Sequence, residues 1–276
     1  MTAVTDQFAV RAGQARLEVE MVSGQSAVTS VSASSPMKVL TPVARGQSVW
    51  AFTSSFGGGL VAGDVTQLEI KVGTGARCFL GTQSSTKIYR NPAARPCSHA
   101  TSAVLAADSL LVFAPEPVQA FAESHYTQRQ EFHLNDRASL VLLDWFTAGR
   151  AARGERWAFA HFNSRNDILI NGQRVLVDPI LLRSTGLLKR MGRFDCLATL
   201  LLIGAPLQAA ARTLAQALAG LPVAKRAAQV CSVSPLRDGV LLRVAGIEVE
   251  NVRRELQHHL GFVNEWLGDN PFARKW

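Results

Sequence analysis

The sequence predicts a large, mostly β fold with two α-helices in its C-terminal third. Short apolar or alternating runs follow one another at close spacing up to about residue 203, with no helical period. The pair Asn171-Gly172 joins two apolar runs, which is a strong signal for a β-hairpin. Helical spacing of apolar residues appears only in residues 206–219 and 248–267.

The expected strands are short runs bounded by turn residues. They are 15–21, 23–35 (several strands joined by turns), 38–40, 48–53, 66–72, 77–81, 82–90, 110–113, 139–144, 168–170 and 174–177. Strand patterns return at 228–233 and 240–244, between the two helices. No stretch has the composition of a linker, so we expect a single domain over residues 1–276.

The first expected helix has clear start and stop signals. Pro206 lies in its first turn, Gly220 follows its last residue, and Pro222 lies beyond. Its apolar face holds Leu207, Ala211, Leu214 and Leu218. The second helix repeats apolar residues from Val249 to Leu267, and its polar face carries Arg253, Arg254 and His258.

The composition indicates a folded, basic protein. The chain has 276 residues, of which 47% are hydrophobic, enough for a substantial core. Its formal net charge of +8 favours acidic partners. Nine basic residues between Arg150 and Arg193 face three acids, a pattern that fits either a solvated face or a docking surface.

Cysteine usage and hydropathy favour the cytoplasm. The four cysteines are widely spaced, without the pairs that bind zinc, and most lie in or beside apolar runs. The N-terminal residues lack a signal-peptide pattern. The longest apolar stretch, 196–207, is too short to span a bilayer, so we expect no membrane partner.

A glycine-rich run at residues 56–64 ends in a carboxylate, Asp64. Glycine permits a positive φ or a close backbone approach there. A strand pattern follows the run, whereas a dinucleotide site needs a helix, and Gly63-Asp64-Val65 lacks the lysine of a phosphate-binding loop. The run is therefore either a polar site or a tight turn.

Two further segments place charges beside apolar strands. Pro115 and Pro117 hold Glu116 in a rigid, extended loop. Asp144 ends an apolar run, and Glu155 follows among glycines and arginines that include Arg150. Because buried charges need partners, a structural Arg–Glu or Arg–Asp pair is one interpretation, and a polar channel or partner site is the other.

No catalytic or tight metal site is evident. The six histidines form no strong helical ligand pair, and no Gly-x-Ser-x-Gly hydrolase motif occurs. We therefore expect neither enzymatic activity nor a tightly bound cofactor.

Four motifs in this order carry a family resemblance. They are Gly58-Gly-Leu-Val-Ala-Gly63-Asp64, Thr82-Gln83…Thr86-Lys87-Ile-Tyr89, Pro115-Glu-Pro-Val-x-x-Phe121, and Asp144-Trp145…Gly149-Arg150-x-x-x-Gly154-Glu155-x-Trp157. Together they make the chain resemble the UreD (UreH) family of urease accessory proteins, from about residue 15 to the C-terminus.

The resemblance implies a two-layered, helically wound β fold and a role as a nickel-insertion chaperone. Its implied partners are a helical UreF-type protein, a UreG-type GTPase and apo-urease, with the helix at 248–267 expected to contact the helical partner. Nickel would pass in transit over exchangeable oxygen ligands. Asp64, Glu116 and Glu155 are the candidate path, with Lys87, Tyr89, Asp144 and Arg150 as further polar residues and Arg150 as a structural partner to one acid.

Two other functions fit parts of the sequence. A carbohydrate- or nucleic-acid-binding module would suit the charge and the five tryptophans, but the basic and aromatic residues are not interleaved, so we expect no nucleic-acid partner. A hydrolase would need Asp64 and Glu155 as a pair of acids facing one cleft.

Overall fold

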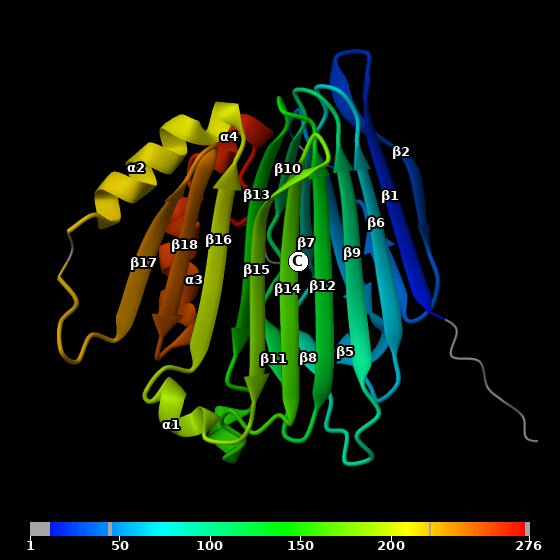
Figure 1. The fold of residues 1–276 in the computed structure, drawn as a ribbon. Coiled ribbons are helices and arrows are strands. Elements are labelled where there is room, and N and C mark those ends of the chain that lie inside the picture. The colour runs from blue at the N-terminus through cyan, green and yellow to red at the C-terminus, as the bar shows by residue number, and fades with distance from the viewer. Residues whose placement is uncertain (1–11, 44–45, 221, 274–276) are drawn as a thin grey trace, which may run out of the picture.

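The chain winds as a flattened coil that feeds strands alternately into two stacked sheets (Figure 1). The computed structural model describes residues 12–43, 46–220 and 222–273. Sheet A has the order β15-β14-β12-β9-β6-β1-β2, and sheet B contains β17-β18-β16-β13-β10-β7-β4-β3 with β5, β8 and β11 attached. The expected two-layered, mostly β fold is confirmed.

The strands of sheet A are β1 (Gly13–Val22), β2 (Gln25–Ala33), β6 (Val65–Val72), β9 (Cys97–Leu105), β12 (His125–Leu134), β14 (His161–Ile170) and β15 (Gln173–Arg183). The strands of sheet B are β3 (Met37–Leu40), β4 (Val49–Ser55), β5 (Gly59–Leu60), β7 (Arg77–Thr82), β8 (Thr86–Ile88), β10 (Leu110–Phe113), β11 (Val118–Ala120), β13 (Ser139–Thr147), β16 (Cys196–Ile203), β17 (Gln229–Leu236) and β18 (Gly239–Gly246). Strands β6, β9, β12 and β14 pair in parallel, as do β4, β7, β10 and β13. Parallel pairing follows because each coil crosses a given sheet in the same direction.

The hairpin expected at Asn171-Gly172 is confirmed. Both residues have a positive φ, 47° and 78°, and the pair joins β14 to the antiparallel β15. Asparagine and glycine adopt this left-handed conformation more readily than other residues do.

Sheet B is interrupted where three neighbouring strands break at the same level. β4 gives way to β5, β7 to β8 and β10 to β11, whereas β13 continues unbroken beside them. We call the intervening residues 56–58, 83–85 and 114–117 the sheet gap. Gly57 and Gly58 turn the chain there with φ of 72° and 71°, which confirms that the glycine run uses positive φ.

Four helices complete the fold: α1 (Leu187–Met191), α2 (Gln208–Leu218), α3 (Val249–His259) and α4 (Val263–Leu267). The last three cover the outer face of sheet B, where Leu214, Leu256 and Leu267 pack against its strands (Figure 1). The two longest helices lie where the sequence predicts them.

Three expectations need correction. α1 is a five-residue helix before residue 203, where none was expected. The segment 248–267 is two helices because the chain leaves helical geometry at Leu260, beside Gly261. Arg253 does not belong to the exposed polar face of α3: its side chain is only 15% exposed.

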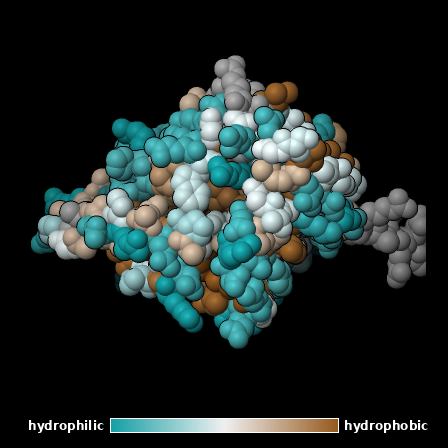
Figure 2. Space-filling view, turned by 90° about the horizontal axis from the view of Figure 1, so that it is seen from above, coloured by the Kyte–Doolittle hydropathy of each residue, from teal (hydrophilic) through white to brown (hydrophobic). Residues whose placement is uncertain are grey.

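Viewed from above in Figure 2, the end of the molecule opposite α1 is mostly hydrophilic, with hydrophobic groups in small separate areas. Within residues 12–43, 46–220 and 222–273, no helix has the length and hydropathy needed to cross a lipid bilayer.

Candidate functional site

A band of polar side chains crosses the interior between the two sheets. On β9, β12 and β14 the inward positions run apolar, polar, polar, apolar. The strand register aligns Thr66, His99, Gln128 and Ser164 in one row and Thr101, Gln130, Asn166 and Asp178 in the next. We call these two rows, together with Asp144, Thr199 and Arg243 from sheet B, the polar band.

Apolar clusters flank the band on both sides. Cys97, Tyr126 and Phe162 belong to one cluster at the start of the three strands. Ala103, Phe132 and Ile168 belong to another, further along the same strands. The polar positions therefore lie inside the sandwich and are not part of its solvent-exposed rim.

Asp144 is the centre of the band. Its carboxylate accepts hydrogen bonds from Gln128 Nε2 at 3.0 Å, from Ser164 Oγ at 3.0 Å and from Asn166 Nδ2 at 3.0 Å. Gln130 Nε2 donates in turn to Asn166 Oδ1 at 2.8 Å. These contacts fix the Asp144 carboxylate between the two sheets, and all three neighbouring side chains donate hydrogen bonds to it.

The pKa of Asp144 is raised by burial, which disfavours the charged carboxylate. The three donated hydrogen bonds act in the opposite direction, and the nearby Asp178 adds to the rise. No arginine or lysine of the described chain pairs with this carboxylate, in contrast to Glu116 and Glu155.

His99 is a neutral member of the same band. Its Nδ1 lies 2.9 Å from Thr66 Oγ1, and its Nε2 lies 3.1 Å from Thr101 Oγ1. Because Thr66 donates its own proton to Ser98 O, its oxygen accepts from the Nδ1–H, which leaves Nε2 as the acceptor. Burial lowers the pKa of His99 to about 4.

The band reaches solvent at the edge formed by β15 and β18. Asp144, Thr199 and Arg243 share one row of sheet B. Arg243 binds the buried Asp178 at 2.6 Å, and about half of the Arg243 side chain is exposed. One end of the band is therefore closed by an ion pair.

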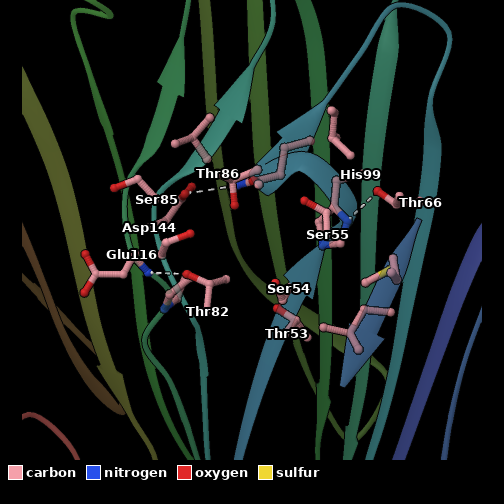
Figure 3. A pocket seen from close by; sticks show the side chains of 18 of the residues that line it. Thr53, Ser54, Ser55, Thr66, Thr82, Ser85, Thr86, His99, Glu116 and Asp144 are labelled. Carbon is pink, nitrogen blue, oxygen red and sulfur yellow. Dashed lines mark hydrogen bonds between the residues drawn. The ribbon is translucent and has the colours of Figure 1, made fainter. Parts of the chain in front are cut away.

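A cavity opens beside Asp144 and extends to the sheet gap. Figure 3 shows Asp144, Thr82 and Glu116 on one side of it and His99 and Thr66 across from them. Thr82, Ser84, Ser85 and Glu116 also line a second, outer groove with Arg253 and Phe272. The sheet gap is thus the wall that separates the interior cavity from the groove beneath α3.

Glu116 is held at this wall by Arg253 of α3. Their closest contact is 2.7 Å, and the Arg253 guanidinium lies 5.1 Å from the Trp145 ring centre. The Glu116 amide donates to Thr82 Oγ1 at 2.8 Å, and its carboxylate points away from the cavity toward the groove (Figure 3). A residue of the outer helix layer therefore controls where this carboxylate points.

Of the three acids expected on a nickel path, only Glu116 lines the cavity. Asp64 accepts a hydrogen bond from Val61 N at 2.9 Å, so it serves the turn of the glycine run. Glu155 is bound by Arg150, whose Nε lies 2.9 Å from Oε2, and by Ala122 N. Arg150 is therefore the ion-pair partner of Glu155, and its hydrogen bonds lower the pKa of that carboxyl group.

Different partners hold Asp64 and Glu155, and neither acid lines the cavity beside Asp144. The structure therefore gives no support to a hydrolase that uses these two acids as a pair. The tryptophans that the structure describes do not support a stacking groove either: Trp50, Trp145 and Trp157 are buried and Trp266 is half-buried, while Trp276 lies outside the described residues.

Lys87 and Tyr89 brace the glycine run from outside the cavity. Tyr89 Oη donates to Gly57 O at 2.7 Å, and its ring meets Phe121 edge-on at 5.5 Å. Lys87 pairs with Gly59 in the short parallel strands β8 and β5. Both residues shape the sheet gap without lining the interior.

The cysteines are poorly suited to hold a metal ion. Burial raises the pKa of Cys78, Cys97 and Cys196 to about 12, so their thiolates are disfavoured. The described part of the chain holds no group of three or more histidine, cysteine or acidic side chains that could bind a metal together.

Sequence reasoning found Asp144 but missed its neighbours Gln128, Ser164 and Asn166. Strands β9 and β12 were not predicted at all, since polar residues replace apolar ones at two successive inward positions. On each of these strands, two successive inward positions are polar while the inward positions before and after them are apolar. This pattern in the sequence is the signal that could have identified the band.

Comparisons with known proteins agree with the resemblance. A family model described as "UreD urease accessory protein" matches residues 11–276. The chain is 45% identical over 270 residues to a protein named urease accessory protein UreD from Sorangium cellulosum (strain So ce56), covering 96% of this chain and 85% of that protein. It is 41% identical to one so named from Anaeromyxobacter sp. (strain Fw109-5), with coverage of 97% and 91%, and 29% identical to urease accessory protein D from Oryza sativa subsp. indica, with 99% of each chain covered.

Proposed function

This chain belongs to the UreD family of urease accessory proteins, with a role in urease maturation, and we propose that it fills that role as a nickel-insertion chaperone. In this proposal it works in the cytoplasm, catalyses no reaction itself, and joins a UreF-type helical protein and a UreG-type GTPase on apo-urease. Nickel is its cargo and not a resident cofactor.

The observation that carries the proposal is the continuity from the polar band to the sheet gap. A divalent cation that crosses a protein interior needs polar groups and some water along its way, because an isolated buried charge is strongly disfavoured. The band supplies amide, hydroxyl and carboxylate groups, and the cavity beside Asp144 reaches the wall at Glu116.

We place Asp144 and Glu116 on the path of nickel. Carboxylate and amide oxygens bind nickel more weakly than a closed cage of cysteine and histidine does, so the ion can leave again. Glu116 lies between the cavity and the groove beneath α3, where a partner could receive or deliver the ion. Asp64 and Glu155, which serve a turn and a loop, fall outside this path.

The contact with the UreF-type partner is proposed to involve the exposed side of α3. Arg254 and His258 lie there, whereas Arg253 faces Glu116. Arg254→Glu tests the contact without disturbing the ion pair at the sheet gap. A co-purification in which this variant retains the partner at the wild-type level would remove α3 from the interface.

Asp144→Asn tests the path, with Asp64→Asn as the matched control. Both variants keep side-chain size and remove one carboxylate, but only the first lies in the cavity. We expect the Asp144→Asn protein to co-purify with its partners while urease receives severalfold less nickel per active site. Asp64→Asn is expected to load urease normally.

Three results would overturn this assignment. Normal nickel loading with Asp144→Asn would remove the band from the path. Loss of the complex together with early melting of the variant would make Asp144 a structural residue. Equal loss of nickel with both variants would point to a general effect of charge.

A further inference from the structure

Three loops meet at the α1 end of the sandwich and bring cations together. Arg156 in the first loop donates to Gly192 O at 2.7 Å, which links residues 150–156 to residues 183–195. Arg193 Nε donates to Ala227 O at 2.9 Å, which adds residues 222–228. We call the exposed cations of these loops the basic end: Arg153, Arg183, Lys189, Arg190, Arg193, Lys225 and Arg226.

The charge of the basic end is not neutralised. The four acids between residues 150 and 195 already bind other arginines: Glu155 binds Arg150, Asp167 binds Arg165 and Arg174, Asp178 binds Arg243, and Asp195 binds Arg156. Within the described chain, none of the seven cations forms an ion pair with a carboxylate. Seven such charges nearly equal the formal net charge of the whole chain, +8. Seven exposed cations without a carboxylate partner are therefore gathered at this end of the molecule.

The same loops expose apolar side chains. Leu188 is 50% exposed and Val223 is 67% exposed, while Leu187 is buried and anchors α1 to the apolar cluster below it. The aromatic side chains here are not available for stacking: the Arg193 guanidinium lies 4.5 Å above the Phe194 ring, and Trp157 is buried. Protein surfaces that bind single-stranded nucleic acid normally offer aromatic side chains on which the bases stack.

We propose that the basic end is a docking surface for an acidic segment of another protein that also carries aliphatic side chains. Seven cations on an anchored surface attract a segment rich in Asp and Glu and steer its approach. Leu188 and Val223 give aliphatic side chains of that segment a place to bury. None of these residues lines the cavity or the outer groove, so this docking does not depend on the passage of nickel.

The test uses the full chain and two labelled 16-residue peptides. One peptide repeats Glu-Glu-Leu, and the other has the same number of glutamates with serine in place of leucine. Fluorescence anisotropy at low and moderate salt gives the affinity of each for the wild-type protein, for Lys189→Glu/Lys225→Glu and for Arg212→Glu/Arg237→Glu. The second variant changes the net charge equally, using exposed cations without a carboxylate partner that lie outside the basic end.

We expect the leucine peptide to bind about tenfold more weakly to Lys189→Glu/Lys225→Glu and nearly normally to the control. Leu188→Ser/Val223→Ser should weaken the leucine peptide and leave the serine peptide unchanged. Equal losses in both charge variants would mean that net charge alone, and not a site, attracts the peptide. Tighter binding of a single-stranded oligonucleotide of equal charge, lost in the same variant, would overturn the assignment to a protein segment.

Discussion

The strands β9, β12 and β14 carry two kinds of interior, apolar clusters at both ends and the polar band between them. The clusters bury side chains such as Phe132 and Ile168, whose removal from water stabilises the fold. The band replaces such burial with hydrogen bonds among side chains, each of which contributes only about 1 kcal/mol net. Equivalent positions on the same strands thus contribute differently to stability, and the band is where we expect function to be concentrated.

The largest expected effect lies in an apolar cluster. Phe132→Ala removes a fully buried ring that packs 5.8 Å from the ring of Phe113, and we expect the free energy of unfolding to fall by about 3–5 kcal/mol. Urea unfolding of the purified protein measures it. A loss below about 1 kcal/mol would mean that this cluster does not hold the sheets together.

The pH dependence of stability distinguishes the band from the clusters. His99 is neutral in the fold with a pKa of about 4, whereas the unfolded chain takes up its proton near pH 6.5. Stability should therefore be lost as the pH falls from about 6.5 toward 4, by about 2–3 kcal/mol at pH 4.5.

His99→Gln is the control for this loss. The groups shared by the two proteins, including Asp144 with its raised pKa and His161 with its lowered pKa, cancel in the comparison. The variant should lose less stability than the wild type between pH 7.5 and 4.5, measured by urea unfolding at each pH. Parallel curves for the two proteins would show that His99 takes up its proton at the same pH in the folded and the unfolded chain, so that burial does not lower its pKa.

The ion pair at the sheet gap should have an intermediate effect. Arg253→Met removes the contact with Glu116, and about 1–2 kcal/mol should be lost because the pair is only partly exposed. A double-mutant cycle with Glu116→Gln should give a coupling of about 1 kcal/mol between the two side chains. Additive losses in the cycle would show that the pair does not connect α3 to the gap.

The smallest expected effect concerns Glu155. Glu155→Gln keeps a side-chain oxygen that can accept from Ala122 N and Arg150, whereas Arg253→Met removes a whole guanidinium, so Glu155→Gln should cost less than about 1 kcal/mol in thermal or urea unfolding. Nickel loading of urease should also stay normal, since Glu155 lies outside the cavity. If a stably folded Glu155→Gln protein instead loaded less nickel into urease, Glu155 would belong to the nickel path. The difference in function between the polar band and the loop that carries Glu155 would then be smaller than we propose.

Local patterns in the sequence predicted the elements whose inward positions are apolar. The hairpin at Asn171-Gly172, strand β6 and the helix α2 each follow from spacing and turn residues alone. Strands β9 and β12 could not be recognised in this way, because residues such as His99 and Gln130 face inward only in a fold that binds them to neighbouring strands.

The residues of the candidate site also fall into two groups, those that local sequence patterns predict and those that they do not. Rigid prolines around Glu116 and the apolar run before Asp144 marked both residues as constrained acids. Their partners lie far away in the chain: Arg253 is 137 residues from Glu116, and Asn166 is 22 residues from Asp144. Contacts of that separation depend on how the coil stacks, which local periodicity does not specify.

The central claim is that nickel crosses the sandwich through the polar band. Crystals of the chain with its UreF-type partner, soaked in Ni²⁺, would test it by anomalous scattering at the nickel edge. We predict a peak within bonding distance of the Asp144 carboxylate, and its disappearance in Asp144→Asn. Peaks only at exposed histidines such as His258, with none between the sheets at any nickel concentration, would contradict the claim.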